Sequence, residues 1–232
     1  MSAQLPLELP LHAALGRAEF AVSDANRAAM TLIEGWQAWP SGKLVLFGPE
    51  GAGKTHLAHV WAEMAGAQVI AAQDIGTQIE ATHIVVEDVP QIGGDRALEE
   101  ALFHLHNRIL GAGGRLLMTG QAAPSTWPIT LPDLASRIQG TLSIALETPD
   151  EDLLSYILLK LFADRQLVPS PSALTTLTLH MERSFAEAGR LVAEMDRRAM
   201  AERRKITADL ARDILDVNRQ SDLPLSPEDA QE

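Results

Sequence analysis

Residues 48–55 have the types and the spacing of a loop that holds phosphate groups. They read Gly-Pro-Glu-Gly-Ala-Gly-Lys-Thr and fit the pattern G-x-x-x-x-G-K-[ST]. Glycines let the backbone turn tightly, so that its N–H groups point at phosphate oxygens. The Lys54 ammonium would bind the β- and γ-phosphates, and the Thr55 hydroxyl would bind Mg²⁺. The sequence therefore predicts a site for ATP or ADP with Mg²⁺, formed by Gly48, Pro49, Glu50, Gly51, Ala52, Gly53, Lys54, Thr55 and His56.

Two neighbouring acids, Glu87 and Asp88, follow a second apolar run at residues 83–86. In sites of this kind, a carboxylate at the end of another strand holds the metal, and a second one polarises the attacking water. The usual order has Asp first, whereas here the longer Glu comes first. We assign Glu87 to Mg²⁺ together with Thr55, and both acids to catalysis. The alternative is a solvated strand end without a catalytic role.

The phosphate loop must connect a strand to a helix if it is to hold a nucleotide. Residues 43–47 form a short apolar run bounded by Gly and Pro, and residues 54–65 have a helical pattern. Further strands are expected at 68–72, 83–86, 116–119 and 142–146, and helices at 23–36, 95–110 and 131–138. This alternation predicts a parallel five-stranded sheet covered by helices on both faces.

The pattern changes after Pro149, where no further strand is indicated. Helices are expected at 150–165, 171–181, 184–203 and 207–217. We divide the chain into an extended leader at 1–15, an α/β domain at 16–148, an all-helical lid at 149–217 and a polar tail at 218–232. Basic residues gather late in the lid, but acids interleave with them, which predicts a solvated helix face. These basic residues are Arg197, Arg198, Arg203, Arg204 and Lys205.

The composition excludes several classes of protein. The 232 residues include no cysteine, which excludes disulfides and thiolate metal sites and fits a reducing cytoplasm. The formal net charge of −12 argues against a protein whose main role is to bind DNA phosphates. No apolar run is long enough to span a bilayer, and the N-terminus lacks the pattern of a secretory signal.

With four further segments, these features resemble the bacterial DnaA-related family of AAA+ ATPases over residues 4–215. The run Gln-Leu-Pro-Leu-Glu-Leu at 4–9 looks like the peptide by which regulatory members of the family bind the DNA polymerase sliding clamp. The resemblance implies that the clamp's beta subunit is bound by Gln4, Leu5, Leu7 and Leu9, in an extended form. Residues 20–23, with Asn26, resemble the segment that packs near the nucleotide base. They also fit a helix cap with a hydrophobic staple.

The other two segments lie after the acids. Residues 116–121 resemble the sensor 1 strand, although the family's Asp is replaced by Gln121. Residues 131–137, Leu-Pro-Asp-Leu-Ala-Ser-Arg, resemble the segment that carries the arginine finger. The resemblance implies that Arg137 reaches into the nucleotide site of a neighbouring subunit, where its guanidinium would stabilise the transferred phosphoryl group. The alternative is an ordinary surface arginine at a helix end.

The family's sensor 2 arginine aligns with Ala186. Together with the order of Glu87 and Asp88 and with Gln121, this departure implies weak hydrolysis by the chain alone. The resemblance then implies a nucleotide-bound, clamp-tethered negative regulator of replication initiation, which promotes ATP hydrolysis by DnaA in trans through Arg137. No room is left after residue 217 for a DNA-reading helix-turn-helix domain, and a homo-oligomer stays open. The alternatives are a self-sufficient ATPase that loads a helicase or acts on DNA, and a scaffold that binds nucleotide without promoting catalysis.

Overall fold

A computed structural model of the chain describes residue 17, residues 20–76 and residues 79–221, with side chains up to residue 216. The predicted leader at 1–15 lies outside these residues, and so does the tail beyond residue 221. Within the described residues, no helix is both long and apolar enough to cross a membrane.

Five parallel strands form one sheet, as the sequence predicts. They are β1 (Lys43–Phe47), β2 (Gln68–Ala71), β3 (His83–Glu87), β4 (Arg115–Gly120) and β5 (Leu142–Ala145), in the order β2-β3-β4-β1-β5. Strand β4 is central, and β1 pairs with β4 and β5, so that Leu44 lies between Leu117 and Leu142. All five strands therefore end at the same edge of the sheet, where the phosphate loop follows β1.

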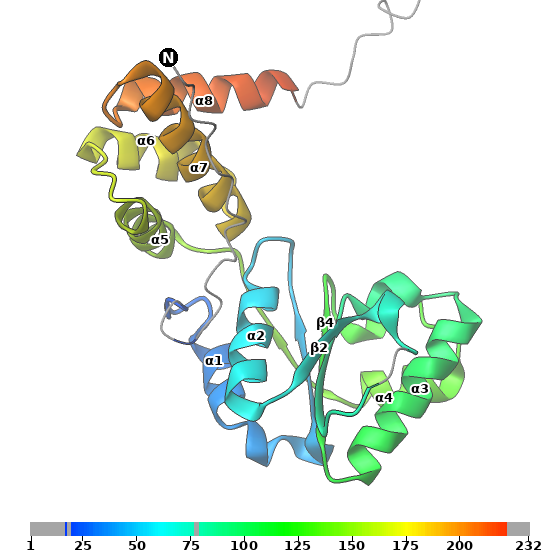
Figure 1. Cartoon of the computed structure of the whole chain (residues 1–232). Helices are drawn as coiled ribbons and strands as arrows, with labels where there is room; N and C mark the ends of the chain where they lie inside the picture. The colour runs from blue at the N-terminus through cyan, green and yellow to red at the C-terminus, as the bar shows by residue number, and fades with distance from the viewer. Residues whose placement is uncertain (1–16, 18–19, 77–78, 222–232) are drawn as a thin grey trace, which may run out of the picture.

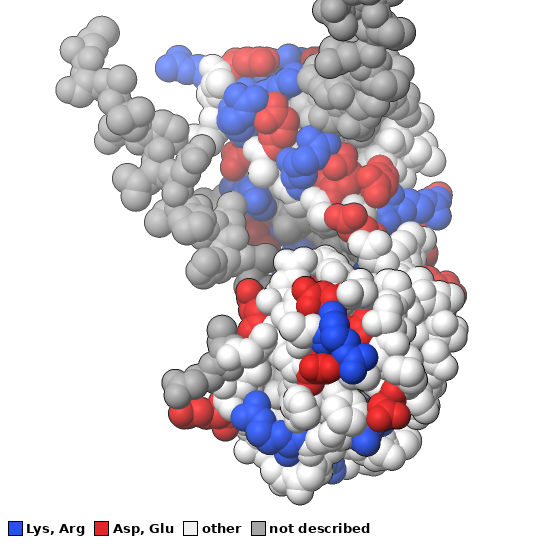
Figure 2. Space-filling model, turned by 90° about the vertical axis from the view of Figure 1, so that its right-hand side faces the viewer, with Lys and Arg blue, Asp and Glu red and all other residues white. Residues whose placement is uncertain are grey.

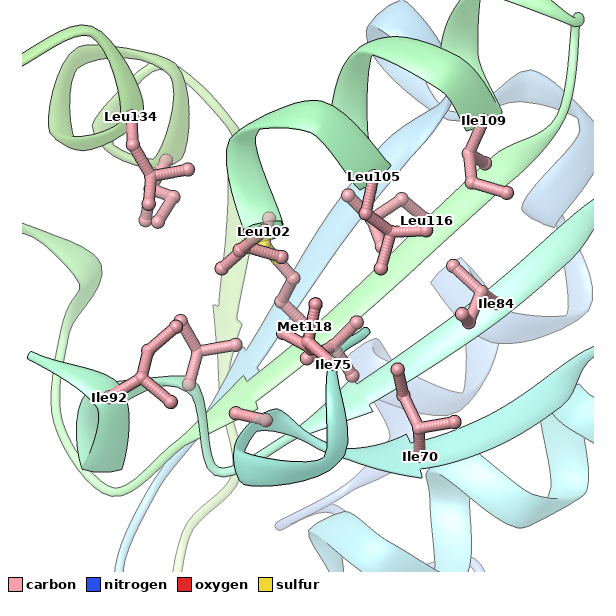
Figure 3. Close-up of a cluster of buried hydrophobic side chains, with 14 of the residues drawn as sticks. Ile70, Ile75, Ile84, Ile92, Leu102, Leu105, Ile109, Leu116, Met118 and Leu134 are labelled. Atoms are coloured by element: carbon pink, nitrogen blue, oxygen red, sulfur yellow. The ribbon is translucent and has the colours of Figure 1, made fainter. Parts of the chain in front are cut away.

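Helices cover both faces of the sheet (Figure 1). On one face lie α1 (Arg27–Glu34) and α2 (Lys54–Ala65), and on the other lie α3 (Arg96–Gly111) and α4 (Pro132–Gln139). Successive residues of β1 point to opposite faces, so Leu44 and Leu46 join the core under α1 and α2, while Val45 joins the core under α3. Figure 3 shows the second core, in which Leu102 and Leu105 of α3 and Leu134 of α4 contribute buried side chains.

The chain after the sheet forms four helices, which we call the lid. They are α5 (Glu151–Asp164), α6 (Pro171–His180), α7 (Phe185–Glu202) and α8 (Ala208–Ser221), and they bury a core of their own. Basic and acidic side chains alternate over the lid in Figure 2. Arg197 and Arg198 on α7 both pair with Glu194, as the predicted interleaving of acids implies. Arg203, Arg204 and Lys205 lie beyond the end of α7 at Glu202, so the expected helix face includes only the first two arginines.

Element ends differ from prediction mainly at α1 and at α8, which continues past the predicted end at residue 217 to Ser221, into the predicted tail at 218–232. A helix starting at Ser23 is wrong, because α1 begins at Arg27. The Asn26 side chain accepts a hydrogen bond from the Ser23 N–H and donates one to the Ala21 carbonyl, which keeps residues 21–25 out of the helix. Short 3-10 helices connect the remaining elements, at Trp36–Ala38, Pro40–Gly42, Ala72–Asp74, Val89–Ile92 and Pro124–Thr126.

Candidate functional site

The phosphate loop runs from the end of β1 to the first turn of α2. Gly51 and Gly53 have φ angles of 73° and 91°, in the left-handed region that favours glycine. A side chain at Gly48 would approach the Leu146 carbonyl oxygen to 2.1 Å. The glycines are therefore required by the backbone path. Ala52 between them is buried, whereas Pro49 and Glu50 are exposed.

Lys54 points its ammonium into this loop. The side chain is buried, and Nζ donates to the carbonyl oxygens of Gly48 and Pro49 over 2.8 Å and 2.7 Å. Burial lowers the pKa of Lys54, and the charges of Asp88, Glu50 and Glu87 partly offset that effect. The structure thus brings the lysine and both predicted acids to one place. A buried ammonium that only carbonyls solvate is well placed to bind phosphate oxygens instead.

The two acids stand in different environments at the end of β3. Oε1 of Glu87 is buried and has no hydrogen-bond partner within the part of the chain that the structure describes. Asp88 has φ 54°, a left-handed conformation, and its N–H donates to the buried Thr119 hydroxyl on β4 over 3.0 Å. Thr119 belongs to the segment that resembles sensor 1, but sequence reasoning assigned it no role, because one polar residue near the end of an apolar strand has no distinctive pattern.

The residues present fit a Mg²⁺ ion that is bound together with phosphate. Among the described residues, no group of three or more His, Cys, Asp or Glu side chains could hold a metal by itself. Mg²⁺ commonly keeps several waters and uses one or two protein ligands plus phosphate oxygens. The unpartnered oxygen of Glu87 and the exposed hydroxyl of Thr55 supply that number of ligands.

Aromatic residues also reach the loop, and one of them, Phe185 of the lid, was not assigned to the site by sequence reasoning. The Phe20 and His56 rings meet edge-on with centroids 5.1 Å apart, which brings the segment before α1 to the first turn of α2. The backbone N–H of Phe185, the first residue of α7, donates to the Gly51 carbonyl oxygen over 3.1 Å. A side chain at Gly53 would meet the Phe185 ring at 3.0 Å. The lid therefore contacts the phosphate loop directly.

The residue that the resemblance aligns with the sensor 2 arginine is Ala186, and the arginines nearest to it in the sequence pair with acids of the lid. Ala186 lies exposed in the first turn of α7. Arg183 pairs with Glu151 over 2.8 Å, and Arg190 pairs with Glu187 over 2.6 Å, so both cations are engaged within the lid.

Arg137 lies in the last turn of α4, and α4 covers the opposite face of the sheet from α2 (Figure 1). Its guanidinium lies 4.7 Å from the centroid of the Phe103 ring, and Nη1 donates to Asn107 Oδ1 over 2.6 Å. Both partners come from α3. Arg137 is exposed, and no interaction given for the described residues joins it to the chain's own phosphate loop. The structure therefore separates Arg137 from Lys54, Glu87 and Asp88.

The proposed clamp-binding residues Gln4, Leu5, Leu7 and Leu9 lie outside the described residues. Their role stays a prediction from the sequence.

The fold was compared with protein-family models and with solved structures. No family model matches the chain. Domain III of the replication initiation protein DnaA from Thermotoga maritima is 18% identical with a TM-score of 0.76, over 88% of this chain and 96% of that one. AMPPCP-bound DnaA from Aquifex aeolicus is 17% identical with a TM-score of 0.66, over 79% of this chain and 68% of that one. RuvB from Thermotoga maritima is 16% identical with a TM-score of 0.68, over 88% of this chain and 72% of that one. The chain therefore has the AAA+ P-loop fold, in a form similar to domain III of DnaA.

Proposed function

We propose that the chain binds ADP or ATP and promotes ATP hydrolysis by DnaA in trans, as the replication regulator Hda does. The position of Arg137 is the observation that carries this proposal. It is an exposed guanidinium in the last turn of α4, which lies on the opposite face of the sheet from α2, the helix that follows the chain's own phosphate loop. An arginine in that place is suited to act on a nucleotide held by another subunit.

The chain's own nucleotide site supports binding more than turnover. Lys54, Glu87 and the glycines of the loop supply the parts that hold phosphate and Mg²⁺. The resemblance aligns Ala186 with the arginine expected to contact the γ-phosphate, and Arg183 and Arg190 pair with lid acids. In this proposal the bound nucleotide orders the α/β module against the lid, and DnaA supplies the ATP that is hydrolysed.

The sliding clamp is the second proposed partner. Residues 4–9 have the residue types of an extended peptide that inserts leucines into an apolar groove. A tether of this kind raises the local concentration of the regulator where the clamp sits on DNA. The net charge of −12 disfavours direct binding to DNA phosphates, so the clamp would provide the link to DNA.

The test is the rate of ATP hydrolysis by DnaA with and without this protein and DNA-loaded clamp. We expect stimulation that requires both additions and is lost in Arg137→Ala. A protein that hydrolyses ATP rapidly by itself, without DnaA or clamp, would instead be a self-sufficient motor or loader. A protein that binds DnaA without raising its hydrolysis rate would be a scaffold.

A further inference from the structure

Glu99 on α3 is a fully buried carboxylate that holds the start of α4. Its Oε2 accepts the backbone N–H of Leu131, the N-cap residue of α4, over 2.7 Å, and the Thr130 hydroxyl over 2.9 Å. Oε1 accepts the N–H groups of Thr130 and Gly94 over 2.9 Å and 2.8 Å. Burial alone would raise the pKa of Glu99, but these hydrogen bonds outweigh it and leave the pKa below its usual value. The carboxylate therefore stays charged.

Lys43 at the start of β1 holds the other end of α4. Its buried ammonium donates over 2.8 Å to the carbonyl oxygen of Arg137 itself, in the last turn of the helix. The Thr141 hydroxyl donates to the same carbonyl over 2.8 Å, and His106 Nε2 lies 3.4 Å from the ammonium. The backbone of the finger residue is thus fixed from the sheet side.

Glu99 and Lys43 are buried charges that act on the same helix, α4. Among the described residues, only three Lys, Arg, Asp or Glu residues are buried: Lys43, Lys54 and Glu99. Lys54 belongs to the phosphate loop, and the other two bind opposite ends of α4. A carboxylate at the N-terminus and an ammonium at the C-terminus both complement the helix dipole. Burying a charge costs free energy unless the charge is hydrogen-bonded, and here each of the two buried charges is bonded to one end of α4.

We propose that Glu99 and Lys43 are positioning residues for the arginine finger. α4 spans only Pro132–Gln139, too short to be a stable helix alone, and its apolar contacts come from Leu134 and Ile138. Those two side chains seat the helix on α3, as Figure 3 shows for Leu134, but they do not fix both of its ends. The buried charges of Glu99 and Lys43 fix the two ends of α4. Glu99 also accepts the Gly94 N–H, and Gly94 lies between β3 and α3. The position of α4 is thereby linked to β3, the strand that ends at Glu87.

This inference rests on the proposed function, and its test compares conservative variants. Glu99→Gln keeps the shape of the side chain but turns an amide nitrogen toward a backbone N–H, whichever way it is oriented. Lys43→Met keeps the apolar stem and removes the ammonium. Matched controls are Glu100→Gln, an exposed neighbour on α3, and Lys205→Met, an exposed lid residue. Because Glu99→Gln could fail to fold, Thr130→Val provides a milder variant that removes only the hydroxyl contact.

The readout is DnaA hydrolysis measured against the concentration of this protein, on DNA-loaded clamp. We expect each positioning variant to lower the maximum stimulated rate by roughly 10- to 100-fold for Glu99→Gln and Lys43→Met, and by less for Thr130→Val, because misplacement by about 1 Å costs that much. The concentration that gives half-maximal stimulation and the affinity for ADP should stay unchanged. In an Arg137→Ala background the same substitutions should cause no further loss.

Other outcomes overturn the inference. It is wrong if the folded variants stimulate as well as the parent and the controls. It is also wrong if Glu99→Gln and Lys43→Met lower the rate equally in the presence and absence of Arg137, or if they lose rate and ADP affinity together, because the residues then support the fold in general. A parent protein that gives no stimulation at all points to failure of the proposed function itself, and in that case both fall.

Discussion

The backbone N–H of Phe185 donates to the carbonyl oxygen of Gly51 over 3.1 Å, and this bond joins the first residue of α7 to the phosphate loop. Ser184, the N-cap residue of α7, sits so close that a side chain at Gly51 would meet its Cβ at 2.2 Å. The lid and the loop therefore share one tightly packed contact. Whatever displaces one of them must move the other.

We expect Gly51→Ala to disturb this contact and to weaken nucleotide binding. The substitution adds a methyl group where Ser184 already lies, and it also places alanine at φ 73°. Backbone strain accounts for about 1 kcal/mol of the lost stability, and overpacking adds about 1–3 kcal/mol. Urea unfolding and titration calorimetry with ADP measure the two effects.

Gly66→Ala is the matched control for that experiment. Gly66 ends α2 at φ 64°, but a side chain there would meet nothing within 4 Å. The control should lose only the backbone contribution of about 1 kcal/mol and should bind ADP like the parent. Equal effects of the two substitutions on ADP affinity would show that the lid contact does not matter for binding.

Lys54→Ala should weaken ADP binding by about 2 kcal/mol or more, because a charged hydrogen bond to phosphate is lost. The buried ammonium donates to the Gly48 and Pro49 carbonyls, and a phosphate oxygen can take their place. Lys205→Ala serves as a control for the loss of one exposed charge. Unchanged calorimetric affinity in Lys54→Ala would contradict the assignment of the phosphate loop.

His106 should make the fold sensitive to mild acid. Burial, together with the nearby charge of Lys43, lowers the pKa of His106 from 6.5 to about 4. Between these values the unfolded chain binds more protons than the folded chain, so the free energy of unfolding falls as the pH drops. The His106 contribution between pH 7 and pH 5 is about 2 kcal/mol.

Urea unfolding at the two pH values, for the parent and for His106→Gln, tests this expectation. Glutamine keeps an acceptor near Lys43 but does not titrate. The variant should therefore lose less stability on acidification than the parent does. His83, whose pKa burial also lowers, is unchanged between the two proteins and cancels in the comparison. An identical loss in both proteins would mean that His106 titrates normally.

The sequence predicted the elements around the phosphate loop closely, because the local signals agree there. Gly and Pro bound β1 on both sides, and the helix after the loop begins at Lys54 and ends at Ala65 as expected. The start of α1 was harder. Ser23 and Asn26 are both good cap residues, and the choice depends on the turn that Asn26 holds through Ser23 and Ala21.

Long-range contacts explain what the sequence could not indicate in the site. Glu99 and Glu100 are adjacent acids in the same helical pattern, yet Glu99 is fully buried against Thr130 and Leu131, while Glu100 forms an exposed pair with Arg96. Only the packing of α4 on α3 distinguishes them. The same packing brings Asn107 to Arg137, 30 residues further along the chain.

The leader offers a prediction that is independent of the described fold. Replacing Gln4 and Leu7 with alanine should abolish binding to the sliding clamp, because the peptide would lose its polar anchor and one of its apolar side chains. ADP affinity and the melting temperature should not change. A pull-down in which the double variant still retains the clamp would refute the peptide's role.

The central claim is tested most directly by Arg137→Ala in the hydrolysis of ATP by DnaA on DNA-loaded clamp. Arginine fingers supplied in trans contribute about 10³- to 10⁵-fold in rate. Lysine at this position should restore little, since a point charge does not reproduce the planar fork of the guanidinium. We predict that Arg137→Ala keeps the fold, ADP binding and clamp binding but loses most of the stimulation. Stimulation by Arg137→Ala equal to that of the parent would contradict the account.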